Sequence, residues 1–101
     1  MSTKWGTHHN KTTFLHITFL KFMYYVYILK TADKRYVGYS SNLKRRIDEH
    51  SKGKVSSTKH KKPIELIYYE AYLKKESAQK RERNLKKFGS AYSSLTKRID
   101  K

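Results

Sequence analysis

The chain has 101 residues and a hydrophobic share of 37%, which is enough for one domain with one modest core. Its formal charge is +16, from 24 lysines and arginines against 8 acidic residues, and this excess indicates a polyanionic partner. The absence of cysteine excludes disulfides, thiolate zinc sites and a cysteine nucleophile, and it is consistent with a cytoplasmic protein.

The positive charge does not form a terminal tail, because only three of the 24 basic residues precede Phe22. Nucleic acid fits this charge better than an anionic membrane, since the sequence has neither a long apolar helix nor a lipidation motif. His16 and Lys21 interrupt the apolar stretch from Phe14 to Leu29, which is too short to span a bilayer. We therefore expect a nucleic-acid partner and no membrane association.

Residues 1–22 form a polar leader without a hydrophobic period, and we expect this extension to be poorly ordered. Met23 directly precedes the first convincing strand, so residues 23–101 are predicted to form the domain. We hypothesise that translation naturally begins at Met23. The intact mass of protein made from its own ribosome-binding site tests this, and a mass matching the whole chain would contradict it.

The first half of the domain predicts a hairpin followed by a helix. Tyr24 to Lys30 and Arg35 to Ser40 are rich in β-branched and aromatic residues and read as two strands around a short turn. Ser40 or Ser41 is a good N-cap for a helix from about Asn42 to Lys52, which Gly53 would end.

The second half predicts a loop, a strand and two helices. Lys52 to Lys62 lacks apolar spacing and is expected to be a solvated or phosphate-bound loop. Ile64 to Tyr72 reads as a strand with Tyr68, Glu70 and Tyr72 on one face, before a helix from Glu76 to Phe88 that Gly89 would end and a short closing helix. The order is ββαβαα, an α/β sandwich with a small, mainly antiparallel three-stranded sheet.

Ionisable residues occupy the predicted packing faces of both long helices. In the first helix the apolar spacing falls on Leu43, Arg46, Ile47 and His50. In the second helix Glu82 lies on the inward face marked by Ala78, Leu85 and Phe88. Burying an unpaired ion costs on the order of several kcal/mol, so these groups together predict a site. Taken singly, each has a simpler interpretation as an ion pair or as a side chain that reaches the rim.

These residues resemble those of the GIY-YIG nucleases. The first motif is matched loosely by Tyr25-Val26-Tyr27 and the second closely by Tyr36-Val37-Gly38, and the family's helix arginine, histidine and glutamate fall on Arg46, His50 and Glu82. The likeness runs from about Met23 to Phe88 and is greatest to the small stand-alone bacterial subfamily. Two departures stand out: Tyr25 replaces the opening glycine, and no asparagine follows Asn84.

The resemblance implies a divalent-metal-dependent endonuclease that hydrolyses phosphodiester bonds with Mg²⁺ or Mn²⁺, acting in DNA repair or recombination. It makes Tyr27 the general base, Arg46 the brace for the phosphate charge and Glu82 the metal ligand. Tyr36 and His50 would orient water or phosphate.

The remaining site predictions concern binding of the nucleic-acid backbone, with DNA favoured over RNA. Gly38 is expected to permit close approach of backbone or substrate. The predicted phosphate contacts are Lys44, Arg45, Lys52, Lys54, Lys59, Lys61 and Lys62. Taken singly, each of these lysines is better interpreted as a solvated surface charge.

Two other functions remain open. A non-catalytic, basic nucleic-acid-binding module of the same fold would explain the charge and the missing asparagine. A small structural protein associated with RNA or the ribosome would explain size and charge, but it would leave Glu82 on an inward face without a reason. The sequence predicts no oligomeric state.

Overall fold

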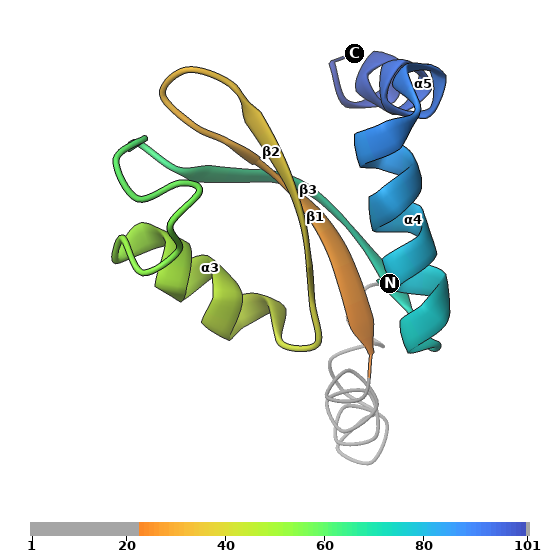
Figure 1. The fold of residues 1–101 in the computed structure, drawn as a ribbon, viewed down its shortest axis with the longest axis horizontal. Helices are drawn as coiled ribbons and strands as arrows, with labels where there is room; N and C mark the ends of the chain where they lie inside the picture. The colour runs from red at the N-terminus through yellow and green to blue at the C-terminus, as the bar shows by residue number, and fades with distance from the viewer. Residues whose placement is uncertain (1–22, 101) are drawn as a thin grey trace, which may run out of the picture.

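A computed structural model describes residues 23–100, and it has the predicted ββαβαα order. The leader expected over residues 1–22 lies outside the described residues. The elements are β1 (Tyr24–Lys30), β2 (Arg35–Ser40), α3 (Leu43–Ser51), β3 (Glu65–Tyr72), α4 (Lys75–Lys87) and α5 (Gly89–Ile99). Figure 1 shows α3 on one side of the sheet and α4 and α5 on the other. Within the described chain, no helix has the length and apolar character needed to cross a membrane.

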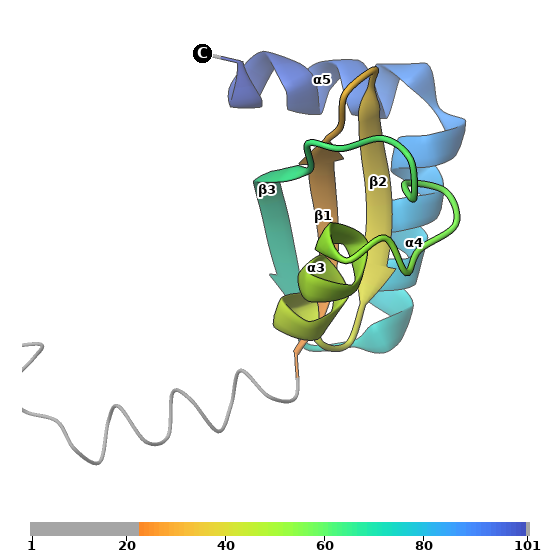
Figure 2. The ribbon, with the colours of Figure 1, turned by 90° about the vertical axis from the view of Figure 1, so that its left-hand side faces the viewer.

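The sheet has three antiparallel strands in the order β2-β1-β3, so β1 lies at its centre. Tyr27 on β1 is the register partner of Gly38 on β2 and of Tyr69 on β3. Residues 25–29 of β1 are all buried because helices cover both faces, as Figure 2 shows with α3 in front and α4 behind. This double coverage explains why β1 reads as a continuous apolar run.

The main core lies between the sheet and the α4 and α5 layer. The strands contribute Val26, Ile28 and Val37, and the helices contribute Ala78, Leu85 and Leu95. Because side chains alternate along a strand, Tyr25 and Tyr27 point to the opposite face, toward α3. The face of β1 that carries Tyr25 and Tyr27 is therefore separate from the face that contributes to the apolar core.

The predicted end of α4 is wrong by a small but informative margin. Phe88 leaves the helix with an extended backbone (φ −108°, ψ 112°), so its side chain is not on the inward face and is 50% exposed. Gly89 opens α5 and does not end α4. A glycine with an ordinary negative φ can start a helix as well as follow one.

The start of α3 also differs from the prediction. Asn42 is the N-cap, because its side-chain oxygen accepts a hydrogen bond of 3.0 Å from the Arg45 amide. Ser40 acts one step earlier, since its hydroxyl oxygen accepts from the Asn42 amide at 2.9 Å. Gly53 does follow the helix as predicted, with a φ of +74° that favours glycine.

The segment between α3 and β3 is not simply a solvated loop. Val55 and Thr58 are buried, and the Thr58 amide donates to the Val55 carbonyl at 3.1 Å. The Lys61 carbonyl accepts from the Ala32 amide at 2.9 Å, which ties the segment to the β1–β2 turn. This segment, residues 52–62, is called the basic loop below; its lysines face outward while two small side chains anchor it.

Candidate active site

The predicted site centres on Tyr27, which is fully buried on β1. Its hydroxyl lies 2.9 Å from Nε2 of His50, which is also fully buried, and a hydrogen bond joins the two side chains. His50 stands in the last turn of α3, so this bond links the central strand to the helix that covers its face.

Gly38 makes room for the Tyr27 ring. A Cβ at Gly38 would lie 2.3 to 2.5 Å from Cζ, the hydroxyl oxygen and Cε1 of Tyr27, so any side chain there would force the Tyr27 ring to move. The close approach that the sequence indicates at Gly38 is thus made by a tyrosine of the same sheet, on the neighbouring strand.

Tyr36 and His50 complete an aromatic cluster around Tyr27. The ring centroids of Tyr36 and His50 are 5.2 Å apart, those of Tyr27 and His50 are 5.7 Å apart and those of Tyr27 and Tyr36 are 6.3 Å apart. Both histidine contacts are edge-on, the arrangement that aromatic pairs prefer. The second strand and α3 therefore bring Tyr36 and His50 to the same place.

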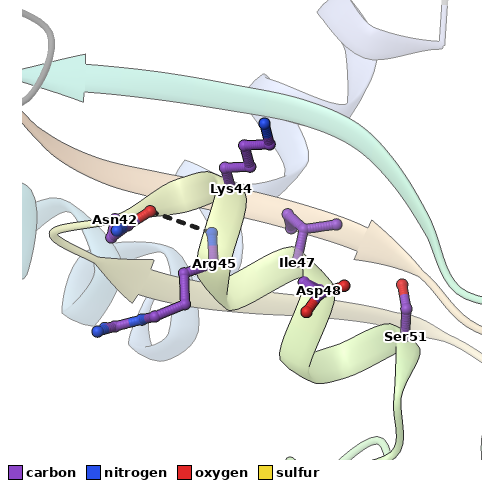
Figure 3. Close-up of a pocket in the computed structure, with 6 residues that line it drawn as sticks. All are labelled: Asn42, Lys44, Arg45, Ile47, Asp48 and Ser51. Carbon is purple, nitrogen blue, oxygen red and sulfur yellow. Dashed lines mark hydrogen bonds between the residues drawn. The ribbon is translucent and has the colours of Figure 1, made fainter.

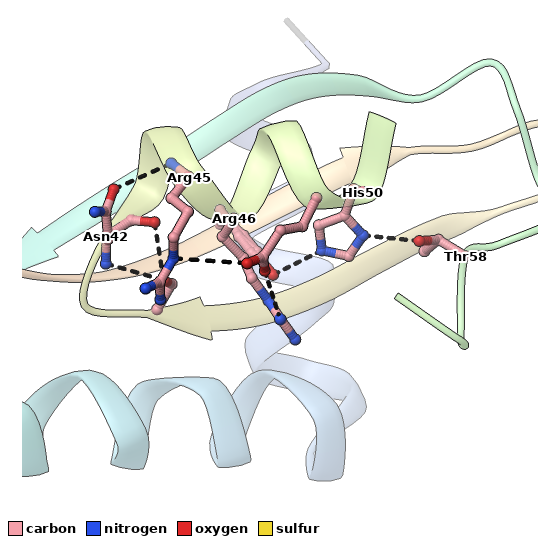
Figure 4. Close-up of polar contacts among 8 residues, drawn as sticks. Asn42, Arg45, Arg46, His50 and Thr58 are labelled. Carbon is pink, nitrogen blue, oxygen red and sulfur yellow. Dashed lines mark hydrogen bonds and ion pairs between the residues drawn. The ribbon is translucent and has the colours of Figure 1, made fainter. Parts of the chain in front are cut away.

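Thr58 is part of this network, although no sequence pattern predicts it. Nδ1 of His50 lies 2.7 Å from the Thr58 hydroxyl, and Thr58 is fully buried (Figure 4). Both ring nitrogens of His50 consequently have partners inside the protein. Thr58 stands in a stretch without hydrophobic period, where neither spacing nor residue type sets it apart from its neighbours.

Burial governs the protonation of both central groups. It raises the pKa of Tyr27 to about 12; hydrogen bonding and charge from Arg46 oppose this rise, while Tyr36 and Glu82 add to it. Burial also lowers the pKa of His50, with a further contribution from the Arg46 cation and an opposing one from Glu49. At neutral pH, Tyr27 is an uncharged phenol and His50 an uncharged imidazole.

Arg46 borders Tyr27 and is only partly satisfied. Its Nη1 donates to Glu49 at 3.0 Å, and its guanidinium lies close enough to Tyr27 to oppose the rise in the pKa of that hydroxyl. Its Nε is buried and has no hydrogen-bond partner within residues 23–100. A guanidinium with an unused donor suits an additional anionic partner such as a phosphate.

Glu82 stands at the edge of the cluster, on α4. Its carboxylate pairs with Lys86 one turn along the helix at 3.0 Å, and the same ammonium lies 5.8 Å from the centre of the Tyr36 ring. Glu82 is also close enough to influence the pKa of Tyr27. Its side chain is 22% exposed, and its pairing with Lys86 agrees with the simpler interpretation of Glu82 as an ion-pair residue.

The donor set fits a metal held by one carboxylate. Among residues 23–100, no three His, Cys, Asp or Glu side chains are grouped so that they could hold an ion. Mg²⁺ is often bound by one or two carboxylates, with waters and substrate phosphates supplying the other ligands. Glu82 could serve in this way, because its oxygens are hard ligands and partly open to solvent.

The predicted phosphate-binding residues are spread over α3 and the basic loop. Lys52 pairs with Asp48 at 3.0 Å, Lys61 with Asp33 at 2.9 Å, and Arg45 approaches Glu49 at 3.7 Å. Within the described residues, the predicted contacts that make no ion pair are Lys44, Lys54, Lys59 and Lys62. All four are exposed and available to a polyanion.

A surface pocket of about 540 Å³ lies along α3 but does not coincide with the aromatic cluster. Figure 3 shows its lining, which consists of Asn42, Lys44, Arg45, Ile47, Asp48 and Ser51. It contains none of the five predicted catalytic side chains. The buried cluster is the better candidate for chemistry, because it holds the hydrogen-bonded tyrosine and histidine.

Comparison with known proteins agrees with these features. The family model of the GIY-YIG catalytic domain matches residues 23–99. The chain is 42% identical to a UPF0213 protein of Streptococcus pyogenes (serotype M5, strain Manfredo) over 65 residues, which cover 62% of the chain and 71% of that protein. It is 37% identical to a UPF0213 protein of Natronomonas pharaonis over 70 residues, covering 67% and 82%.

A solved structure is similar as well. The solution NMR structure of a UPF0213 protein of Bacillus halodurans is 30% identical in sequence and matches with a TM-score of 0.49. The match covers 76% of this chain and 84% of that protein.

Proposed function

This chain belongs to the GIY-YIG catalytic domain family, and from that premise we propose that it is a metal-assisted endonuclease that hydrolyses phosphodiester bonds in DNA. The observation that supports the proposal best is the buried hydrogen bond between Tyr27 and His50, with Arg46 beside it. A phenol, an imidazole and a guanidinium at one point are suited to proton transfer next to a phosphate. DNA repair and recombination are the processes we propose for it.

The protonation of Tyr27 limits the mechanism. Burial raises the pKa of Tyr27 to about 12, so the phenol is protonated at neutral pH in the free protein. Tyr27 can still take a proton from water if it gives up its own proton in the same step. Nε2 of His50, 2.9 Å from the Tyr27 hydroxyl, could accept that proton in the tautomer that leaves Nε2 unprotonated.

Arg46 would bind the phosphate and stabilise its additional negative charge in the transition state. Its buried Nε has no partner in the part of the chain that the structure describes, and its Nη1 is held by Glu49. A bound phosphate could therefore accept a hydrogen bond from a donor that the free protein leaves unused. Tyr36, whose ring contacts His50, would help to position the phosphate or the water.

We propose that Glu82 holds Mg²⁺ or Mn²⁺, with water and substrate oxygens as the remaining ligands. When bound, the ion supplies charge that stabilises the leaving 3′ oxygen. Glu82 would exchange its pairing with Lys86 for the ion, and the freed ammonium would then be available for a phosphate.

The second candidate function is a nucleic-acid-binding module of the same fold that does not cut. The ion pair between Glu82 and Lys86 favours it, since a paired carboxylate has no need of a metal. The exposed lysines of the basic loop serve either function equally well.

Glu82→Gln separates the two candidates. We expect metal-dependent cleavage of single-stranded, double-stranded or branched DNA by the wild type, and a loss of at least about 100-fold in Glu82→Gln, because an amide is a much poorer ligand for a hard cation. Cleavage is measured with Mg²⁺, with Mn²⁺ and with EDTA, and RNA substrates are run in parallel.

The matched control is Glu76→Gln, which removes the same charge from the first turn of the same helix. We expect it to cleave like the wild type, and both variants to fold and to bind nucleic acid. Equal residual cleavage by wild type and Glu82→Gln would indicate a contaminant and contradict the catalytic proposal. Binding without cleavage by the wild type would favour the binding module.

A further inference from the structure

The junction between α4 and α5 exposes an aromatic ring. Phe88 is 50% exposed, and its extended backbone (φ −108°, ψ 112°) separates the two helices. Phe88 is also the N-cap of α5, where its side chain makes no capping hydrogen bond and where a small polar residue would stabilise the helix. The fold alone therefore gives little reason for a phenylalanine at this position, and an exposed ring there points to a ligand.

Positive charge lies around this ring. The ammonium of Lys87 is 5.7 Å from the centre of the Phe88 ring, which is within the range of a cation–π contact. Arg83 stands four residues before Lys87 and thus on the same face of α4. Both cations are exposed, and within residues 23–100 neither makes an ion pair. A Cβ at Gly89 would meet nothing within 4 Å, so there is open space at the junction.

Lys86 connects this surface to the candidate active site. Its ammonium lies 5.8 Å from the centre of the Tyr36 ring and 3.0 Å from the carboxylate of Glu82. Lys87 follows it directly, so two adjacent lysines in the last turn of α4 each lie over an aromatic ring, one at the site and one at the junction. A nucleic-acid strand with a phosphate at the site can therefore reach the junction with a neighbouring nucleotide.

We propose that Phe88, Lys87 and Arg83 form a subsite for an unpaired nucleotide, whose base stacks on the ring and whose phosphate binds the two cations. Every base has a flat π face, so such stacking accepts any base, but the base must be free of its duplex neighbours. This inference deepens the proposed function and rests on it for the position of the cut. It favours substrates with a single-stranded segment next to the cleaved bond.

An anionic membrane would attract the same cations, but the structure favours a nucleic acid. Binding in a membrane interface needs the apolar face of a whole helix, whereas Phe88 is one ring between two helices. The contact of Lys86 with Tyr36 also makes the surface continuous with the candidate active site.

Binding in EDTA tests the subsite without cleavage. Fluorescence anisotropy compares labelled oligothymidylate with a blunt DNA duplex. We expect Phe88→Leu, which keeps an apolar side chain and the net charge, to bind the single strand about tenfold more weakly, as for the loss of one stacked base. Its affinity for the duplex should stay within about twofold of the wild type, and its salt slope should not change because no cation is removed.

The matched control is Leu73→Ala. Leu73 is 62% exposed and precedes Lys74 and Lys75 at the other end of α4, so it is also an exposed apolar residue beside two lysines. We expect it to bind both nucleic acids like the wild type. Equal losses in Phe88→Leu and Leu73→Ala would overturn the subsite, because apolar exposure in general would then explain both. Circular dichroism checks that each variant folds.

Fluorescence detects the stacked base directly. Trp5 is the only tryptophan of the chain, so the double variant Trp5→Phe, Phe88→Trp carries its single indole at position 88. We expect bound oligothymidylate to quench the emission strongly, and the blunt duplex and anionic phospholipid vesicles to have little effect. Unchanged emission with the bound single strand would overturn the inference. A response to vesicles without a response to the single strand would also overturn it and assign the ring to a membrane.

These outcomes are distinguishable from those of the proposed function. Quenching by the single strand together with its weaker binding by Phe88→Leu supports the subsite, even if the wild type cleaves nothing with Mg²⁺ or Mn²⁺ and the proposed function fails. Cleavage by the wild type with single-strand binding unchanged in Phe88→Leu overturns the subsite and leaves the proposed function intact. The double variant alone decides the matter if Phe88→Leu does not fold.

Discussion

At the scale of single residues, the site depends on Gly38, because this residue has no side chain. The atoms of Tyr27 nearest to a Cβ at Gly38 include the phenol oxygen, which is the atom that bonds His50. A larger residue at this position would therefore meet the reactive end of Tyr27 directly. The glycine is needed for space between two strands, since its φ is not in the left-handed region.

Gly38→Ala tests this point. We expect it to lower the free energy of unfolding by about 1 to 3 kcal/mol, the usual cost of overpacking, because the Tyr27 ring must move. Urea unfolding measures the loss, and the chemical shifts of His50 report whether its bond to Tyr27 is broken.

Gly89→Ala is the control for the same chemical change. A Cβ at Gly89 meets nothing within 4 Å, and the residue lies in the first turn of α5. We expect its stability to be unchanged or to increase by up to about 1 kcal/mol. Equal losses at the two positions would mean that Gly38 has no special steric role.

The sequence predicts those site residues whose type and spacing indicate a catalytic role. It misses residues that belong to the site only because the folded chain places them there. Tyr27, Tyr36, Arg46 and His50 come together because period two and period 3.6 place them on facing surfaces. Thr58 belongs to no period, so nothing in a single sequence distinguishes it from the other hydroxyl residues nearby. Lys86 is absent from the predicted site, although its position four residues after Glu82 is a recognisable signal.

At the scale of elements, a carboxylate network joins β3 to α4 on the core side of the sheet. Glu70 accepts from Nε and Nη2 of Arg81 at 2.9 and 3.0 Å, and from the hydroxyls of Tyr68 and Tyr72 at 2.5 Å each. Burial alone would raise the pKa of Glu70, but these hydrogen bonds outweigh it and lower the pKa. The network fixes α4, which carries Glu82, against the sheet.

Arg81→Met should destabilise the fold by about 3 kcal/mol at pH 7, since it leaves the Glu70 carboxylate partly buried without its cation. In the wild type the folded pKa of Glu70 is below its unfolded value, so its contribution is present above that unfolded value and is lost as pH falls through the folded pKa. Urea unfolding from pH 7 to pH 3 should therefore bring the wild type and the variant closer together.

The control is Asp100→Asn, which breaks the exposed pair between Arg35 and Asp100. Solvent screens that pair, so we expect little change in stability at either pH. A gap between wild type and Arg81→Met that stays constant with pH would show that Arg81 contributes through packing and not through Glu70.

The elements themselves are largely predictable, and the errors lie at junctions. The strands and both long helices follow from apolar period and β propensity, which act over many residues. The junction of α4 and α5 lies at Phe88, whose backbone is extended. Gly89 does not predict this break unambiguously, because a glycine can either follow a helix or begin one. Val55 and Thr58 are the two buried side chains of the basic loop, and two residues are too few to create a detectable pattern.

At the scale of the whole molecule, a strongly positive net charge contrasts with two uncharged side chains at the candidate site. The chain carries +16, while Tyr27 and His50 are uncharged and buried. The basic loop lies on the α3 side of the sheet, close to the helix that supplies Arg46 and His50 (Figures 1 and 2). Lys44 on this helix and the loop residues Lys54, Lys59 and Lys62 are exposed. This arrangement predicts that binding is mostly electrostatic and insensitive to sequence, with chemistry confined to one place.

Salt dependence of binding tests this division of charge. Replacing Lys54, Lys59 and Lys62 of the basic loop by Gln should reduce the slope of log K against log salt by about 0.9 for each phosphate of duplex DNA that is no longer neutralised. Fluorescence anisotropy at several salt concentrations measures the slope. The matched control replaces Lys75, Lys80 and Lys97, exposed lysines of α4 and α5, and removes the same total charge. If only net charge mattered, both triple variants would show the same reduction in slope. A reduction confined to the first would place the nucleic-acid backbone over the basic loop.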